Sequence, residues 1–367
     1  MKIRGVWLTN VDSQIFNSKQ HLTEAIQFLA NIGFNTIFPV VWNKGFTLYH
    51  SQVMKDNFGV DFEIAPKYQQ QSRDPLLEVV EAAKKVKLKV IPWFEYGFAY
   101  SHQILKDQHK QRLQKNFYKK GWIAYDQQDK PLKKNGFEWL NALDPEVQNF
   151  ILNLMLEVIQ NYDVDGIQGD DRVPAFPSEG GYDQKTKQRF RHKFGEEPPL
   201  NTKDQVWLQW RADLLTDFLA RLYQKVKAIN PNLIVSIAPH PFKFGFQEYL
   251  QDCPNWLKLG LVDIIHPQLY RRNVKGYKAL AKEILNQLTT DQLPKLSPGI
   301  LMKVGNFRIS ANDLCKIIEY NRQSGIQGEV FFFYEGLREN NSELARILLK
   351  NNYREASLIL KEQGLSD

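Results

Sequence analysis

Short apolar segments alternate along the chain with segments in which apolar residues recur every three or four positions. The short segments are rich in Val, Ile and Phe and are apolar on both faces, as expected of parallel strands covered by helices. Eight strands are predicted, at Arg4–Leu8, Thr36–Val41, Lys89–Phe94, Gly166–Gly169, Leu233–Ala238, Val262–His266, Lys295–Leu301 and Glu329–Tyr334. Eight strand-then-helix units predict an α/β fold, a (β/α)8 TIM barrel.

The segments between the strands carry helical periodicity and residues typical of helix ends. Helices are expected from Ser18 to Ile32 with a stop at Gly33, from Asp74-Pro75 through Val86, from Asp144-Pro145 through Ile159, from Asn201 or Thr202 toward Ile229, and over Tyr277–Leu288, Ser310–Gln323 and Asn340–Leu349. An open doubly wound sheet is the alternative. We prefer the barrel because no Gly-rich dinucleotide or phosphate loop follows a predicted strand.

Two connections are much longer than the others. One follows the third strand, about Glu95 to Trp139, and one follows the fourth, about Arg172 to Pro199. Long loops usually carry function, and both should lie on the C-terminal face, where barrel active sites form. We expect residues 1–340 to form the barrel and residues 341–367 to form a C-terminal helix and a charged tail.

Composition, charge and cysteine content limit the kinds of protein that this chain can be. Of 367 residues, 43% are hydrophobic, which is enough for a sizeable core, and 24% are charged. The net charge of +7 is spread over short runs rather than one patch, which argues against nucleic-acid binding. The two cysteines, Cys253 and Cys315, match no disulfide or metal-binding pattern. The sequence contains no apolar run that could span a membrane and no signal peptide, so the chain as written is expected in the cytoplasm.

Polar or aromatic residues follow each predicted strand. Because the carboxyl ends of barrel strands meet at one face, we expect these side chains to surround one site. They are Thr9, Asn10, Trp42, Asn43, Trp93, Glu95, Tyr96, Asp170, Asp171, Arg172, His240, His266, Gln268, Tyr270, Lys303, Tyr334 and Glu335.

Asp170 and Asp171 are the most informative of these residues, because they close a short buried strand. Side chains alternate along an extended strand, so one carboxylate should face the site while the other braces the loop. Cleavage of a glycosidic bond needs one protonated and one ionised carboxyl group. We take Asp170 as the ionised group, nucleophile or base, with Arg172 or Lys303 keeping it charged.

The proton donor would be Glu335 or Glu95, because each follows an aromatic run that can desolvate it and raise its pKa. The aromatic residues at strand ends would stack on sugar rings. These are Trp42, Trp93, Tyr96, Tyr270 and Tyr334. The remaining substrate contacts are expected from Asn43, Asp171, Arg172, His240, His266, Gln268 and Lys303.

Two other functions fit the same ring of residues. His240, His266, Asp170 and Asp171 could converge on a metal ion, as in metal-dependent barrel hydrolases, although the first two strands add no ligand pair. A barrel that binds carbohydrate without cleaving it is the other alternative, because the fifth strand ends without a glutamate. The main hypothesis needs no metal and no cofactor, and its partner is a polysaccharide or oligosaccharide.

At this point the chain resembles the bacterial glycosyl hydrolase-like family 10, most closely its cyanobacterial-type branch. The resemblance spans residues 3–335 and lies in Arg4-Gly5-Val6-Trp7-Leu8-Thr9, Pro92-Trp93-Phe94-Glu95-Tyr96-Gly97-Phe98, Asn141-Ala142-Leu143-Asp144-Pro145, Asp165-Gly166-Ile167-Gln168-Gly169-Asp170-Asp171 and His266-Pro267-Gln268-Leu269-Tyr270-Arg271. It implies a carbohydrate-active hydrolase, and some relatives are thought to act on peptidoglycan glycan strands. It also leaves a periplasmic or cell-envelope location open.

The fourth strand is also similar to that of the α-amylase clan, in which the aspartate at the position of Asp170 is the nucleophile. The chain departs from that clan at Gln168, where an arginine is usual, and at His240, which follows the fifth strand without a glutamate. Against the chitinase pattern, Arg172 stands at the position of the catalytic glutamate. Neither mechanism therefore transfers whole to this chain.

Overall fold

The computed structural model describes residues 2–102 and 108–353. Within them, parallel strands form the sheets β13–β16–β1–β2–β5 and β12–β11–β10–β6. These strands are β1 (Arg4–Leu8), β2 (Thr36–Pro39), β5 (Lys89–Val90), β6 (Trp93–Phe94), β10 (Gly166–Gly169), β11 (Ile234–Ile237), β12 (Ile264–Ile265), β13 (Gly299–Leu301) and β16 (Glu329–Phe332).

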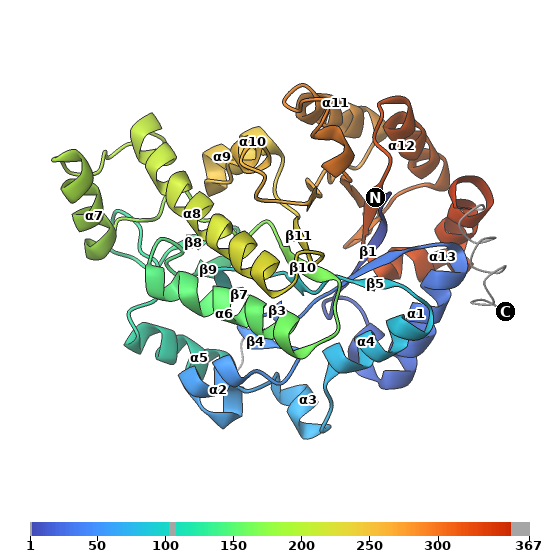
Figure 1. Ribbon diagram of the computed structural model, residues 1–367, viewed down its shortest axis with the longest axis horizontal. Coiled ribbons are helices and arrows are strands. Elements are labelled where there is room, and N and C mark those ends of the chain that lie inside the picture. Colours follow the sequence, from blue (N-terminus) through green and yellow to red (C-terminus); the bar gives the residue numbers. More distant parts are fainter. Residues whose placement is uncertain (1, 103–107, 354–367) are drawn as a thin grey trace.

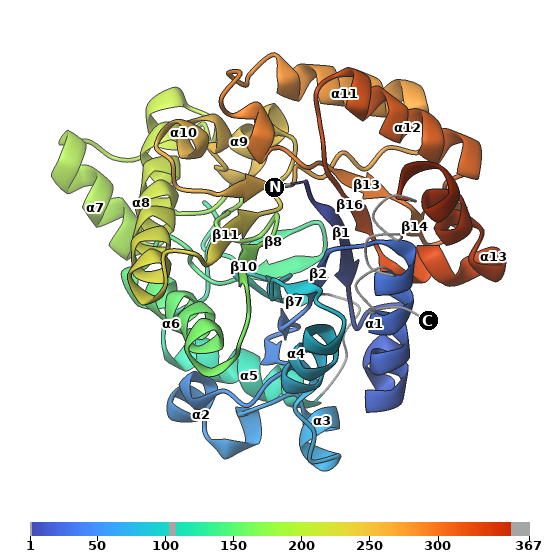
Figure 2. The ribbon, with the colours of Figure 1, turned by 45° about the vertical axis from the view of Figure 1, so that its right-hand side comes forward.

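The two sheets close into one barrel. Bridges between Val40 and Trp93 and between Ile265 and Leu296 join their edges. β5 pairs with β2 and β6 pairs with β10, so these two short strands share the third position around the barrel. Eight strand positions result, and helices surround them in Figure 1 and Figure 2. The predicted (β/α)8 barrel is confirmed, although its strands are mostly shorter than expected.

The covering helices begin and end largely where the local chemistry dictates. They are α1 (Lys19–Ile32), α4 (Pro75–Lys85), α6 (Pro145–Asn161), α8 (Gln205–Ile229), α9 (Phe242–Tyr249), α10 (Cys253–Lys258), α11 (Val274–Leu285), α12 (Ala311–Gln323) and α13 (Tyr334–Ile347). Ser18 caps α1 by accepting from the backbone N–H of His21, and Gly33 ends it with a left-handed φ of 94°. Asp144 caps α6 ahead of Pro145, as predicted.

Two helix starts were predicted at the wrong residue. The helix expected from Asn201 or Thr202 begins after Asp204, whose carboxylate accepts from the N–H groups of Val206 and Trp207. The helix expected from Tyr277 begins at Val274, because the Asn273 side chain accepts from the N–H of Gly276. In both cases a side chain that satisfies free N–H groups sets the boundary more strongly than apolar spacing does.

The predicted helix Asn340–Leu349 is also wrong in its bounds. α13 starts at Tyr334, directly after β16, and its backbone leaves the helical conformation over residues 339–342. A π-helical turn, Leu348–Asn352, follows it. The expected domain boundary at residue 340 falls inside this broken helix and stays a prediction, while the charged tail of residues 354–367 lies outside the described residues.

The long connections contain structure of their own. The connection after β6 holds β7 (Ala99–His102), α5 (Gln108–Lys119), β8 (Lys133–Lys134) and β9 (Phe137–Trp139), in which the strands form an antiparallel sheet. The connection after β10 holds α7 (Gln184–Phe194), and that after β13 holds the hairpin β14 (Lys303–Val304) and β15 (Phe307–Arg308). The elements after β2 were not predicted. They are β3 (Trp42–Asn43), β4 (Phe46–Thr47), α2 (Gln52–Phe58) and α3 (Pro66–Gln70).

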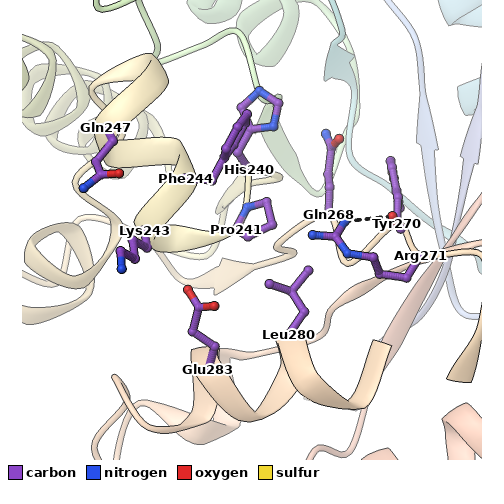
Figure 3. Close-up of a pocket in the computed structure, with 10 residues that line it drawn as sticks. All are labelled: His240, Pro241, Lys243, Phe244, Gln247, Gln268, Tyr270, Arg271, Leu280 and Glu283. Carbon is purple, nitrogen blue, oxygen red and sulfur yellow. Dashed lines mark hydrogen bonds between the residues drawn. The ribbon is translucent and has the colours of Figure 1, made fainter. Parts of the chain in front are cut away.

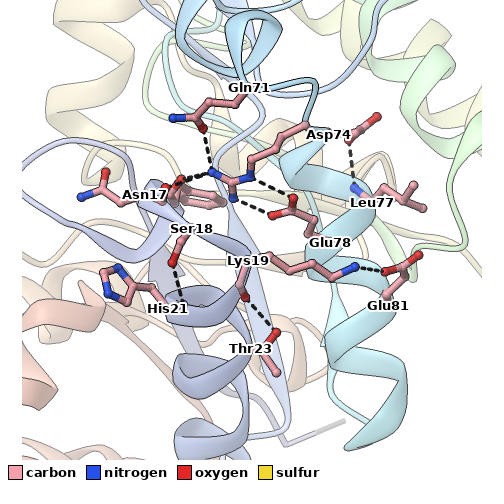
Figure 4. A network of polar contacts seen from close by, with 12 residues as sticks. Asn17, Ser18, Lys19, His21, Thr23, Gln71, Asp74, Leu77, Glu78 and Glu81 are labelled. Atoms are coloured by element: carbon pink, nitrogen blue, oxygen red, sulfur yellow. Dashed lines mark hydrogen bonds and ion pairs between the residues drawn. The ribbon is translucent and has the colours of Figure 1, made fainter.

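Polar contacts connect α4 to α1 and to the segment before α1 (Figure 4). Arg73 donates through Nε and Nη2 to the two carboxylate oxygens of Glu78, at 2.9 and 2.6 Å, and through Nη1 to the carbonyl of Asn17. Lys19 on α1 pairs with Glu81 on α4 at 2.9 Å, as Figure 4 shows. The exposed Lys19–Glu81 ion pair adds little stability. The bidentate contact of Arg73 with Glu78 fixes the position of the segment that leads into α4. No helix in the described ranges is both long and apolar enough to cross a membrane.

Candidate active site

The site begins where the chain turns after β10. The carbonyl of Asp170 accepts from the N–H of Val173, and a Cβ on Gly169 would lie only 2.2 Å from the carbonyl oxygen of Val173. This tight turn ends the extended conformation at once. As a result, Asp170 and Asp171 both reach the same guanidinium, that of Arg172. The expectation that the two carboxylates point to opposite sides held only for a continuing strand, and the turn removes that condition.

Arg172 is the centre of the cluster. Its Nη2 lies 3.0 Å from Asp170 Oδ2, its Nη1 lies 2.9 Å from Asp171 Oδ1, and its Nε donates to the backbone carbonyl of Glu95 at 2.9 Å. The ring of Phe137 covers the guanidinium at 4.5 Å. Burial alone would lower the pKa of Arg172, but the surrounding carboxyl groups raise it overall. A permanent positive charge therefore lies among three carboxyl groups.

Asp170 is only 2% exposed, and both of its carboxylate oxygens accept hydrogen bonds. Oδ2 accepts from Arg172, and Oδ1 accepts from the Gln268 side-chain amide at 2.8 Å. Burial, then the neighbouring Asp171, raise the pKa of Asp170 well above its usual range, while Arg172 opposes them. Because hydrogen bonds into a carboxylate favour its ionised form, Arg172 and Gln268 oppose this rise in the pKa of Asp170 without reversing it.

Glu95 follows β6 and lies beside this cluster. Its Oε2 accepts from the side-chain amide of Asn43 on β3. Burial raises the pKa of Glu95 to about 7, and the nearby Arg172, Asn43 and Lys44 limit the rise. A carboxyl group that titrates near neutral pH is suited to proton transfer, because it can both hold and release a proton near pH 7.

His240, after β11, completes the polar edge of the site. Its Nε2 lies 3.5 Å from Asp171 Oδ2, and its ring stacks on Tyr249 with centroids 4.4 Å apart. Burial lowers the pKa of His240, so the imidazole is neutral near pH 7. Its backbone N–H donates to the buried Gln251 side chain at 3.0 Å, which fixes the strand end.

Aromatic rings pack beneath and beside the carboxyl groups. Tyr270 lies between Trp7 and Phe332, with ring centroids 6.5 and 5.1 Å away. Trp93 contacts Trp7 at 6.2 Å, and Tyr96 packs on Phe137, the ring that covers Arg172. Trp93 and Tyr96 are 2% and 5% exposed, so of these three predicted rings only Tyr270 lines an open cavity.

Trp7 was missed as a site residue. Its indole N–H donates to Gln168 at 2.7 Å, and the Gln168 amide donates to Ser236 at 2.8 Å. Gln168, which departs from the α-amylase pattern, is therefore part of the packed barrel interior. The signal for Trp7 was its place one residue before the end of β1, among strand ends that all converge.

Two predicted contacts are wrong because the side chains are buried elsewhere. Trp42 is fully buried, donates to the carbonyl of Gly97 and packs against Phe150 on α6. His266 is also fully buried, and its Nδ1 contacts the carbonyl of Ser297 at 2.7 Å. Burial lowers the pKa of His266 to about 4, so it is a neutral core residue.

Three further predictions belong to a different part of the rim. The Glu335 carboxylate accepts from the Ser13 hydroxyl at 2.7 Å, and with Tyr334 it lines a separate hollow between α1 and α13. Lys303 pairs with Glu339 at 2.8 Å rather than with Asp170. The structure therefore brings Glu95 to Asp170 through Arg172 and does not bring Glu335 there.

A cavity of about 560 Å³ opens beside the carboxyl groups (Figure 3). It is lined by His240, Pro241, Lys243, Phe244, Gln247, Gln268, Tyr270, Arg271, Leu280 and Glu283. His240 contacts Asp171 and Gln268 contacts Asp170, so these two lining residues connect the cavity to the aspartates. Among the described residues, no three His, Cys, Asp or Glu side chains are grouped to hold a metal ion. The predicted metal site needed His240, His266, Asp170 and Asp171 to converge. His266 lies in the core, so it is lost from this set of ligands.

Comparison with known sequences identifies the family. The chain matches the family described as glycosyl hydrolase-like 10 over residues 2–314. It is 24% identical to the glycosyl hydrolase DigH of Escherichia coli strain K12 over 76% of this chain and 65% of that protein. It is 22% identical to the glycosyl hydrolase YngK of Bacillus subtilis over 98% of this chain and 73% of that protein. The chain thus spans less than two thirds of the length of the E. coli relative.

Solved structures with the same architecture are glycosidase domains. The glycoside hydrolase domain of PgaB (BpsB) from Bordetella bronchiseptica superposes with a TM-score of 0.64 at 12% identity, over 95% of this chain and 99% of that one. The catalytic domain of a Paenibacillus polymyxa β-amylase gives 0.63 at 12% identity, over 96% and 98%. These likenesses show the fold, while the predicted branch within the family stays a prediction. The match over residues 2–314 shows that the chain belongs to the glycosyl hydrolase-like 10 family.

Proposed function

We propose that the protein is a glycoside hydrolase that cleaves a polysaccharide at the barrel mouth. Glu95 would donate its proton to the glycosidic oxygen, and the Asp170 carboxylate would attack the anomeric carbon or take a proton from the attacking water. The observation that carries the proposal is the cluster around Arg172, which pairs with the Asp170 carboxyl group, binds the backbone carbonyl of Glu95 and lowers the pKa of the Glu95 side chain against the effect of burial. The pKa of Glu95 is about 7, so both of its protonation states are populated near neutral pH, and the Asp170 carboxyl group accepts hydrogen bonds at both oxygens.

Arg172 has a definite part in this scheme. Its guanidinium holds Asp170 directly and reaches Glu95 only through the backbone carbonyl. The positive charge therefore favours the ionised form of Asp170 most directly, against the burial that raises the pKa of that group. Asn43 orients the Glu95 carboxyl, and Tyr270 offers a ring to the sugar. The glycan strands of peptidoglycan, which the family resemblance implied, are the first substrate to test.

The decisive experiment is the release of glycan fragments from purified peptidoglycan and from a panel of plain polysaccharides. Asp170→Asn keeps the shape of the side chain and one acceptor oxygen, so the variant should fold and should release no product. Its thermal unfolding, measured beside the wild type, checks the fold. Equal release by the variant would remove Asp170 from the chemistry.

A second function is favoured by one observation, the near-complete burial of Asp170. A barrel that binds glycan without cleaving it would keep the cavity and have no need for an accessible carboxylate. The same experiment separates the two functions. Retention on one polysaccharide without product from any would support binding alone, and product would exclude it.

A further inference from the structure

The cavity beside the carboxyl groups does not end at the barrel mouth. A second hollow, of about 540 Å³, is lined by Gln209, Phe242, Lys243, Phe246, Gln247, Asp252, Pro254, Glu283 and Gln287. Lys243, Gln247 and Glu283 line both spaces. The two spaces therefore lie next to each other along α9 and α11, and we refer to them together as the groove.

The groove has two distinct walls (Figure 3). Lys243, Phe244 and Gln247 project from α9 on one side, and Leu280 and Glu283 project from α11 on the other. Phe244 is 48% exposed, a large fraction for an aromatic side chain beside an active-site candidate. An open ring together with amide and charged groups is typical of surfaces that stack on one sugar face and bind its hydroxyls.

The charges of the groove are balanced. Lys243 and Glu283, which face the same space, make no side-chain hydrogen bond or ion pair with any described residue. Arg271 near the mouth and Asp252 at the far end add one charge of each sign. The free charged groups of both signs are available to sugar hydroxyl and amide groups.

We infer that the groove holds a linear glycan of more than one sugar unit, which runs from the carboxyl groups along α9 and α11. This inference rests on the proposed function and deepens it, because it gives the polysaccharide a path and places several of its sugar units on named residues. A small glycoside would occupy only the mouth. Each further sugar along the groove would add binding, so longer chains would be better substrates.

The test uses ladders of oligosaccharides of graded length, made from peptide-free peptidoglycan strands, chitin, xylan and starch. Gln247→Trp places a bulky ring at a residue that lines both spaces. Gln323→Trp is the matched control, because Gln323 is an exposed residue of α12 that lines neither space. Thermal unfolding confirms that both variants fold.

In the wild type, kcat/KM should rise with chain length. The ratio of kcat/KM for the longest to that for the shortest chain should fall at least about tenfold in Gln247→Trp and stay unchanged in Gln323→Trp. An unchanged ratio in Gln247→Trp would overturn the groove while leaving the hydrolase intact. If no ladder is cleaved, the proposed function fails, and binding of the same ladders decides for the groove: weaker binding of long chains by Gln247→Trp supports it, and equal or absent binding overturns it.

Discussion

Two glutamates follow barrel strands after aromatic runs, and they lie in very different surroundings. Glu95, after β6, is held by Asn43 beside Arg172, and burial raises its pKa to about 7. Glu335, after β16, accepts from the Ser13 hydroxyl and the N–H of Gln14 at the edge of an open hollow. The two looked equivalent in sequence, so the difference lies in what packs around each carboxyl group.

The insertion that follows each strand explains this difference. After β6 the chain builds the sheet of β7, β9 and β8, which places Phe137 over Arg172 and next to Tyr96. After β16 the chain enters α13 at once, and Glu335 lies in the first turn of that helix. Acidic side chains are favoured in a first helical turn, which is a structural role. Desolvation by an inserted layer therefore distinguishes a candidate acid from a helix-end carboxylate.

The largest expected effect comes from replacing each of the two glutamates by glutamine in a separate variant. Glu95→Gln should lower kcat/KM on an unactivated polysaccharide by about 10²- to 10⁴-fold, the usual contribution of a proton donor, and Glu335→Gln by less than about threefold. Initial rates on one polysaccharide measure both. The reverse order of the two effects would exchange the roles of the glutamates.

A smaller effect is expected on the pH dependence of stability. The folded protein holds a proton on Glu95 up to about pH 7, whereas an unfolded glutamate releases it near pH 4.5. Because the folded state binds more protons in this window, the free energy of unfolding should fall as pH rises through it, by roughly 3 kcal/mol at most. Glu95→Gln should lack this fall, and Glu335→Gln should keep it.

Urea unfolding at pH 5 and pH 8 measures the effect in wild type and both variants. Other titrating groups are common to all three proteins, so the difference between the curves isolates the replaced glutamate. Parallel pH dependence in wild type and Glu95→Gln would mean that Glu95 titrates as an ordinary exposed carboxyl group.

Much of the fold was predictable because it depends on local chemistry. Apolar runs marked the strands, and Ser18, Asp74 and Asp144 marked helix starts through their capping side chains. The short elements after β2 were not predictable, since two-residue strands such as β3 leave no periodic signal. The starts of α8 and α11 were misplaced by about three residues, because a cap competes with apolar spacing.

The site was predictable only in part. Five residues converge as expected from their places at strand ends: Glu95, Asp170, Asp171, Arg172 and Gln268. A strand end does not determine where a side chain points, and this is why Trp42 and His266 lie in the core. For other predicted residues, a partner distant in the sequence determines where the side chain lies. Lys303, for example, pairs with Glu339.

The role of Glu95 is tested most directly by the pH profile of kcat/KM on a glycoside with an activated aryl leaving group, which departs without a proton donor. In the wild type, kcat/KM on the natural polysaccharide should fall above about pH 7, as Glu95 loses its proton. Glu95→Gln should cleave the aryl glycoside at a rate close to that of the wild type, and its much slower cleavage of the polysaccharide should lack the fall at high pH. Slow cleavage of the activated substrate by Glu95→Gln, or a fall near pH 7 that persists in it, would contradict the assignment of Glu95 as the proton donor.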